Sequence, residues 1–143
     1  MIELLVVIGV LAVLLTIVLI AINPARQFSQ ANDTKRRSDV NALLNAVHQY
    51  AADHKGLLPG GGEITTTVTD INSTNMPNLC TSLVSDYLAA LPVDPLTNNG
   101  LPVASCSAAA WDTNYTIVRS AANSRITVAA PAGELDPNIS VTR

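Results

Sequence analysis

The amino-acid sequence predicts an α+β fold. A long N-terminal helix, hydrophobic in its first half and amphipathic in its second, packs on a small antiparallel β-sheet head. Three observations support this fold class: an uncharged apolar run over residues 4–22, an apolar stripe at helical spacing over residues 40–51, and three short β-prone segments within residues 114–142. One nearly continuous helix over residues 1–55 is roughly 80 Å long at 1.5 Å per residue. A chain of 143 residues forms no globule that encloses such a helix, so we expect half of it to protrude.

The apolar run from Leu4 to Ile22 contains no charged residue, and Thr16 is its only hydroxyl. At a helical rise the run spans roughly the 30 Å hydrocarbon core of a bilayer. Its apolar residues cover every face, which excludes an amphipathic surface helix. The rest of the chain is too small to enclose it as a buried core helix, and a secretory signal has a shorter apolar region that follows basic residues. We therefore expect a helix that lies in a lipid bilayer.

The basic residues that follow the run raise the question of its orientation. Arg26 and the triplet at residues 35–37 come after the run, and basic residues mark the cytoplasmic flank of membrane helices. A disulfide in the C-terminal region, predicted below, places that flank outside the cytoplasm. The two indications agree if a basic leader has been removed from the N-terminus, which we expect. The triplet itself is interpreted as a solvated face with Asp33 and Asp39 nearby, and a headgroup-binding patch is the alternative.

Pro24 divides the long helix. The residue before a proline is pushed out of the α region, so a kink or an unwound turn is expected at Ile22–Asn23. The run before it is rich in β-branched residues of modest helix propensity. In the assembled state we therefore expect the helix to be interrupted between Ala12 and Pro24.

The second half of the long helix carries the stripe on which the head is expected to pack. Phe28 and Ala31 are expected to extend the stripe towards the N-terminus, while Gly56 ends the helix and Pro59 follows. The predicted organisation is therefore a filament-core or transmembrane helix over residues 1–23, the amphipathic half over 24–56 and the head over 57–143. Residues of the stripe recur three and four positions apart: Val40, Leu43, Leu44, Val47, Tyr50 and Ala51.

The C-terminal region is predicted to form the head. A Gly- and Thr-rich loop over residues 57–76 has room for one short strand, and the leucines of Pro77–Leu91 share one helical face and predict a second helix. Strands are predicted at Asn114–Arg119, Arg125–Ala130 and Ile139–Thr142, with the first two joined as a hairpin. An antiparallel sheet with one apolar face is the expected cover for the stripe of the long helix.

The sequence has two cysteines, Cys80 and Cys106. A zinc site is not expected, because there is no second cysteine pair and both histidines, His48 and His54, lie on the first helix. Two buried free thiols are the alternative. We predict a disulfide, since an exported chain with a small core gains stability from one; closing a loop of about 27 residues gives about 3.5 kcal/mol in the loop-entropy treatment.

Charge and composition argue against nucleic-acid binding. The net charge of −3 divides into −1 for residues 1–22, +2 for residues 23–56 and −4 for residues 57–143. The exposed part is therefore acidic, which disfavours contact with phosphates. Aromatic residues make up only 3% of the chain, so a stacking platform for single strands is also lacking. We expect no direct nucleic-acid partner.

The sequence carries no motif of a known catalytic class. It has no nucleophile elbow, Walker loop, H-E-x-x-H or C-x-x-C, and we expect no enzymatic activity and no cofactor. Oxygen-bearing side chains at Asp94, Asn98, Asn99 and Asp112 are of the type that binds calcium. Because Asp and Asn also dominate turns, we interpret this stretch as turn chemistry, with a calcium site near Asp94 as the alternative.

The first residues carry a family resemblance. Residues 1–11, MIELLVVIGVL, resemble the mature N-terminus of type IV pilins, in which Phe-Thr-Leu-Ile-Glu-Leu begins an apolar helix. Glu3 matches the family's glutamate, Pro24 resembles the proline at which that helix bends, and Tyr87–Leu96 is similar to a segment of type IV pilins and of type II secretion pseudopilins. The sequence departs from the pattern at its start, where the glutamate is third rather than fifth and no Phe precedes it.

The resemblance implies a structural subunit that polymerises into an extracellular type IV pilus for adhesion, motility or DNA uptake. Glu3, Gly9 and Pro24 are then assembly residues, and Glu3 pairs with the N-terminal amine of an adjacent subunit or of its own chain. The implied partners are identical subunits in a helical filament, the inner-membrane assembly machinery and the lipid bilayer before assembly. A pseudopilin of a type II secretion system is one alternative. A monomeric, membrane-anchored binding module, in which Glu3 is incidental, is another.

Overall fold

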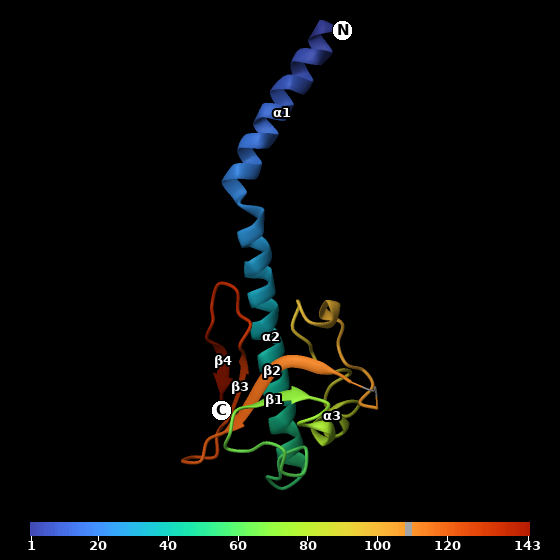
Figure 1. Cartoon of the computed structure of the whole chain (residues 1–143), viewed down its shortest axis with the longest axis vertical. Coiled ribbons are helices and arrows are strands. Elements are labelled where there is room, and N and C mark those ends of the chain that lie inside the picture. The colour runs from blue at the N-terminus through green and yellow to red at the C-terminus, as the bar shows by residue number, and fades with distance from the viewer. Residues whose placement is uncertain (108–109) are drawn as a thin grey trace.

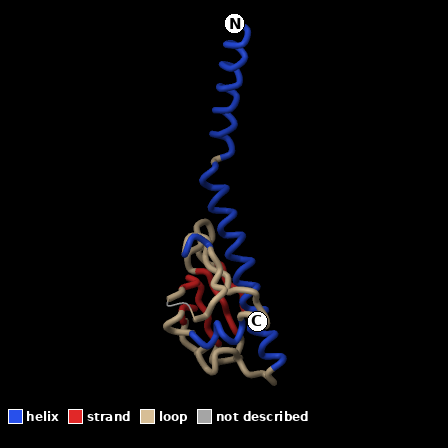
Figure 2. The backbone as a smooth tube through the Cα atoms, turned by 90° about the vertical axis from the view of Figure 1, so that its right-hand side faces the viewer, coloured by secondary structure: helices blue, strands red, loops and turns tan. Residues whose placement is uncertain are grey.

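The computed structural model describes residues 1–107 and 110–143 and has an α+β architecture. Two helices, α1 (Ile2–Ile22) and α2 (Pro24–Asp53), form a stalk, and the head covers only the part of α2 that is distant from α1 (Figure 1). The view in Figure 2 shows that the head lies to one side of α2, which leaves the other side of this helix open. The long helix therefore protrudes from the head for about half of its length, as the sequence predicts.

The head is built on a four-stranded antiparallel sheet in the order β1-β2-β3-β4. Its strands are β1 (Thr69–Asn72), β2 (Asp112–Arg119), β3 (Ile126–Ala130) and β4 (Ile139–Thr142). Buried residues alternate along β2 and β3, because successive side chains of a strand point to opposite faces. The buried face includes Tyr115, Ile117 and Val128 and packs against α2. The last three strands match the segments predicted from the sequence within two residues.

The stripe of α2 forms the helical half of the core. Val40, Leu43, Leu44 and Val47 are at most 1% exposed, and α2 packs against β3 and β4. Burying a Val or Leu side chain stabilises the fold by about 1.5–3 kcal/mol, so these residues hold the head on the stalk. The expected extension of the stripe is wrong, because Phe28 is 71% exposed and Ala31 is exposed as well. The head begins farther along α2 than the apolar residues suggested.

The second predicted helix is shorter than its leucine pattern indicated. The helix α3 covers Pro77–Leu83 rather than Pro77–Leu91, and Val84 is already extended. Ser85 has a φ of 82°, which a helix does not accommodate. Leu91 then exchanges two backbone hydrogen bonds of 2.9 Å with Val103. The leucines after Leu83 still reach the core, Leu91 fully and Leu88 in part, but from turns and isolated bridges rather than from a helix, so their helical spacing is coincidental.

Candidate assembly surface

The helix α1 presents an apolar surface on all sides. None of its residues is buried, and each of its large apolar side chains is at least 49% exposed. Among the described residues it is the one helix long and apolar enough to cross a bilayer. Gly9 forms a notch in this surface, because a Cβ there touches nothing, and Leu5, Val6 and Val13 lie beside it. Such a surface is stable only in lipid or against other apolar helices.

Glu3 lies in the first turn of α1, where its carboxylate is favoured by the helix dipole. Among the described residues its side chain has no hydrogen bond or ion pair with the rest of the chain. The nearest apolar neighbours, Ile2 and Leu4, are also exposed. The structure therefore places one unpaired carboxylate at the edge of an otherwise apolar surface.

The break between α1 and α2 lies at Asn23. This residue has φ 47° and ψ 77°, a left-handed conformation that ends α1, and asparagine tolerates it better than most residues. Its carbonyl oxygen accepts from the N–H of Arg26 at 3.1 Å, and its side-chain Oδ1 accepts from the same N–H at 3.4 Å. Pro24 occupies the first position of α2, where no donor is needed. The kink expected at Ile22–Asn23 is present, and Figure 1 shows the change of axis.

A disulfide joins Cys80 to Cys106, as predicted, with a Cα–Cα distance of 5.6 Å. It ties α3 to the segment that leads into β2. Tyr50 of the stripe is half-buried at the end of α2. The Tyr50 ring stacks on His54 at a centroid distance of 3.9 Å and meets Tyr87 edge-on at 5.6 Å. These contacts close the end of the head that is distant from α1.

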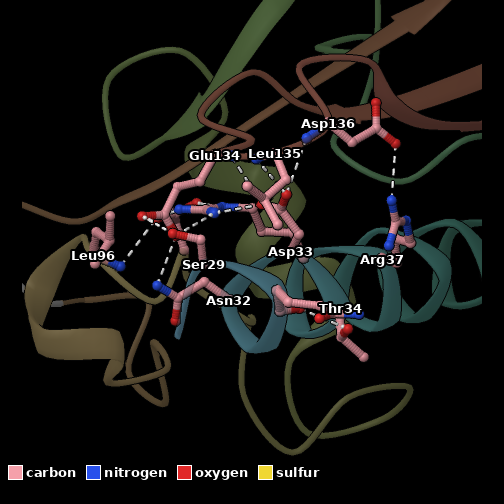
Figure 3. A network of polar contacts seen from close by, with 12 residues as sticks. Ser29, Asn32, Asp33, Thr34, Arg37, Leu96, Glu134, Leu135 and Asp136 are labelled. Carbon is pink, nitrogen blue, oxygen red and sulfur yellow. Dashed lines mark hydrogen bonds and ion pairs between the residues drawn. The ribbon is translucent and has the colours of Figure 1, made fainter. Parts of the chain in front are cut away.

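A buried polar network fixes the opposite end of the head (Figure 3). At its centre Arg36 is fully buried. Its Nε donates to Asp94 Oδ2 at 2.6 Å and its Nη2 to Asp94 Oδ1 at 3.1 Å. Its Nη1 donates to Asp33 Oδ1 at 2.8 Å and to Glu134 Oε2 at 3.3 Å. The hydrogen bonds to these acids, that to Asp94 first, outweigh burial and raise the pKa of Arg36 above its ordinary value. The expectation that this residue belongs to a solvated face is therefore wrong.

Asp33 anchors the loop between β3 and β4, residues 131–138. Its carboxylate accepts from the backbone N–H groups of Glu134, Leu135 and Asp136 at 2.9, 2.8 and 3.1 Å. Burial by itself raises the pKa of Asp33, but these three donors together with Arg36 lower it from 3.8 to about 2. One carboxylate of α2 thus holds three successive residues of the loop in place.

Glu134 and Asp136 add contacts from the loop back to α2. Glu134 accepts from Asn32 Nδ2 at 2.7 Å, and Asp136 pairs with Arg37 at 2.9 Å on the surface. Within the same loop, a Cβ on Gly133 would collide with the carbonyl oxygen of Asp136. The loop is therefore folded tightly on itself as well as fastened to the helix.

Asp94 is engaged by protein groups rather than open to a cation. Besides Arg36, its Oδ1 accepts from the N–H of Leu96 at 2.9 Å, which is the side-chain turn that its sequence context suggests. Both carboxylate oxygens of Asp94 are therefore hydrogen-bonded to the guanidinium of Arg36. Within residues 1–107 and 110–143, no group of three or more His, Cys, Asp or Glu side chains is arranged to hold a metal ion.

Comparison with known proteins returns no match to a family model, to a characterised protein or to a solved structure. What the structure itself shows is a pilin-like architecture. A long hydrophobic helix continues into an amphipathic helix, which packs on a four-stranded antiparallel sheet closed by a disulfide.

The residues assigned to assembly from the sequence do not converge on one site. Glu3 and Gly9 lie on α1, and Pro24 lies at the junction of the two helices. The network around Arg36 was missed by sequence reasoning. The spacing of Asp33 and Arg36 was a signal for one pair, but Asp94 and Glu134 are 58 and 98 positions from Arg36, and nothing local indicates them.

Proposed function

We propose that this chain is a structural subunit that polymerises into an extracellular filament of the type IV pilus class. The observation that carries the proposal is α1, an all-round apolar helix that projects from a folded polar head. A filament core made of such helices removes them from water and leaves the heads at the surface. Each Leu, Ile or Val that is fully buried contributes about 1.5–3 kcal/mol. This gain is relative to water, so it resists the release of a subunit from the filament into solvent.

The proposed subunit passes through two environments. Before assembly α1 lies in the inner membrane, since its length fits the hydrocarbon core. The inner-membrane assembly machinery then transfers it into the filament, where α1 exchanges lipid for the α1 helices of identical subunits. Each subunit meets the next through two different surfaces, and a rotation between subunits that does not close generates a helical polymer from this contact.

Glu3 is proposed to control this assembly. An unpaired carboxylate in hydrocarbon costs several kcal/mol, and Glu3 has no partner within its own described chain. The resemblance to pilins provides one, the N-terminal amine of an adjacent subunit or of its own chain. The pair neutralises two charges inside the core and sets the axial position of an incoming subunit. Neither a plain membrane anchor nor a soluble binding module needs such a pair.

The test is the yield of sheared filaments, counted by electron microscopy, from cells that express the full chain together with an assembly system. Glu3→Ala is expected to leave the head folded and α1 in the membrane while the filament yield falls steeply. Glu3→Asp is expected to assemble in part, because the charge remains with a shorter reach. Asp70→Ala is the matched control, since it removes an exposed head carboxylate and is expected to give wild-type yield.

Three outcomes contradict the proposal. Wild-type filament numbers from Glu3→Ala make the acid incidental to assembly. A wild-type chain that stays in the membrane without forming filaments indicates a monomeric, membrane-anchored binding module. Short filaments confined to the periplasm and formed only on overexpression indicate a pseudopilin.

A further inference from the structure

The end of the head that faces α1 carries a rigid protrusion, the loop of residues 131–138. Leu135 near its middle is 51% exposed. The Leu135 side chain lines a surface groove with Arg26 and Gln30. These two residues precede Asp33 on α2, so the side chain is on the side of the loop that faces α1. An exposed leucine on a loop that is already ordered loses little conformational entropy when it is buried by a partner.

The opposite end of the head carries a pocket of about 620 Å³, within the range of about 300–1,000 Å³ that is typical of binding sites. Its lining residues come from the end of α2, from the loop that follows it and from the end of β2. Its apolar wall is formed by Tyr50, Leu57, Leu58 and Ile64, and Arg119 stands beside it. Leu57 is 69% exposed, so part of this wall is open to water.

The two ends also differ in charge. The loop itself carries two acids, Glu134 and Asp136, and no base. Together with the charged residues of α2 and the acid Asp94 around it, this end has four acids and three bases, a net charge of −1: Asp33, Asp94, Glu134 and Asp136 against Arg26, Arg36 and Arg37. At the pocket end, three bases whose side chains make no hydrogen bond or ion pair with the described residues, Lys55, Arg119 and Arg125, outnumber the acids Asp53 and Glu63, which gives a net charge of +1. Opposite charges at the two ends favour an encounter of one end with the other over an encounter of like ends.

We propose that the loop of residues 131–138 in one copy of the chain docks into the pocket at the far end of the head of a second copy, with Leu135 as its buried anchor. The docking rests on the proposed polymer, because it joins two different surfaces of identical subunits. The loop side of the contact is acidic, and Arg119 of the second copy faces it.

The positions of the two surfaces along α2 set the stagger of the copies. The loop is bound at the level of Asp33, and the pocket lies at the level of Tyr50 to Gly56. At 1.5 Å per residue this separation is about 26–35 Å. A displacement of that size along the axis brings the loop of one copy to the pocket of the next.

A second pair of charges gives a similar stagger. Arg26 follows Glu3 by about 35 Å of helix at 1.5 Å per residue, less the shortening at the Asn23 kink. Neither side chain has a hydrogen bond or ion pair elsewhere in the described chain. The displacement that seats the loop therefore also brings Glu3 of one copy level with Arg26 of the other, which is a different neighbour from the one whose N-terminal amine is proposed to pair with Glu3.

Disulfide cross-linking of the full chain tests the docking. We introduce Leu135→Cys and Leu57→Cys together, both at exposed positions, and verify by intact mass that Cys80–Cys106 has formed. Mild oxidation is expected to give a ladder of covalent oligomers. The control pair is Leu101→Cys with Leu57→Cys, because Leu101 is 60% exposed but lies outside the loop. This control protein is expected to stay monomeric.

Leu135→Ser, with the native cysteines only, is expected to lower the yield of sheared filaments about tenfold, as loss of one leucine contact predicts.

The outcomes separate the docking from the pilus role. Filaments that form while the Leu135–Leu57 pair gives no ladder overturn the docking and leave the pocket to another occupant. A ladder in membranes from a chain that forms no filaments supports the docking and removes the pilus role. Equal ladders from the test and control pairs show non-specific collision and overturn the docking. Absence of both filaments and ladder overturns both proposals.

Discussion

Replacing Asp33 by asparagine tests whether the loop of residues 131–138 is held by a buried carboxylate. The side chain of Asp33 is 2% exposed and accepts four hydrogen bonds, one from Arg36 Nη1 and three from backbone N–H groups of the loop. Asparagine has the same shape, but one of its two terminal groups is a donor. In either orientation the amide group points two N–H donors at two N–H donors of its neighbours.

The magnitude follows from what is lost. Each buried N–H left without an acceptor costs about 1–3 kcal/mol, and breaking a buried ion pair costs about 3–5 kcal/mol. Two factors reduce the sum. Arg36 keeps Asp94 and Glu134 as partners, and removal of one of three carboxylates relieves repulsion among them. We therefore expect Asp33→Asn to lower the free energy of unfolding by about 3 kcal/mol.

The assay is equilibrium urea unfolding of the full chain in a non-ionic detergent, followed by the fluorescence of Trp111. This residue is the single tryptophan and is 8% exposed, so its emission reports on the head. The matched control is Asp136→Asn, because the Arg37–Asp136 pair has side chains that are 52% and 41% exposed. An exposed pair is worth about 1 kcal/mol or less. A loss from Asp33→Asn no larger than that of the control refutes the reasoning.

Two further predictions concern pH and the disulfide. The pKa values of Asp33 and Asp136 are lowered in the folded chain, so their contribution is present above pH 4 and is lost as the pH falls towards 2; for Asp33 it is about 1–2 kcal/mol after allowance for solvent screening. The pKa of Tyr115 is raised by burial and by its hydrogen bond to Asp39, so stability is also lost above pH 10. Urea midpoints measured across pH 2–11 are therefore expected to fall at both ends and to be flat in between. The fall at acid pH is expected to be smaller in Asp33→Asn, and an equal fall in that variant contradicts the assignment. Reduction of Cys80–Cys106 is expected to lower the free energy of unfolding by about 3.5 kcal/mol. The same urea titration with and without reductant measures this change, and equal midpoints in the two titrations count against a stabilising disulfide.

The features that the sequence predicted well depend on local chemistry. An apolar run of fixed length, a proline at a defined position and the alternation within short strands each constrain the backbone by interactions among near neighbours. Hence α1, the break before Pro24 and the last three strands lie where the patterns placed them. The disulfide was also predicted from the sequence, because an exported chain with a small core gains stability from one, and two cysteines then allow a single pairing.

The features that it missed depend on residues far apart in the chain. The leucines after Leu83 have a helical period, but their backbone conformation was decided by the pairing of Leu91 with Val103. Phe28 belongs to the apolar pattern of α2 and remains exposed, because at this level the loop of residues 131–138 contacts α2 through the polar residues Ser29 and Asn32.

Arg36 shows most clearly what only the tertiary structure decided. By itself, an arginine between two other basic residues on a helix is expected in water, since burying an unpaired charge is costly. Its burial became favourable only because Asp94 and Glu134, from two distant segments, are brought to its side by the folding of the sheet around α2. The sequence alone determined that the chain has a protruding apolar helix and a small sheet-based head. Which charges pair inside that head was decided by the three-dimensional arrangement, because an ion pair depends on distance in space and not on spacing along the chain.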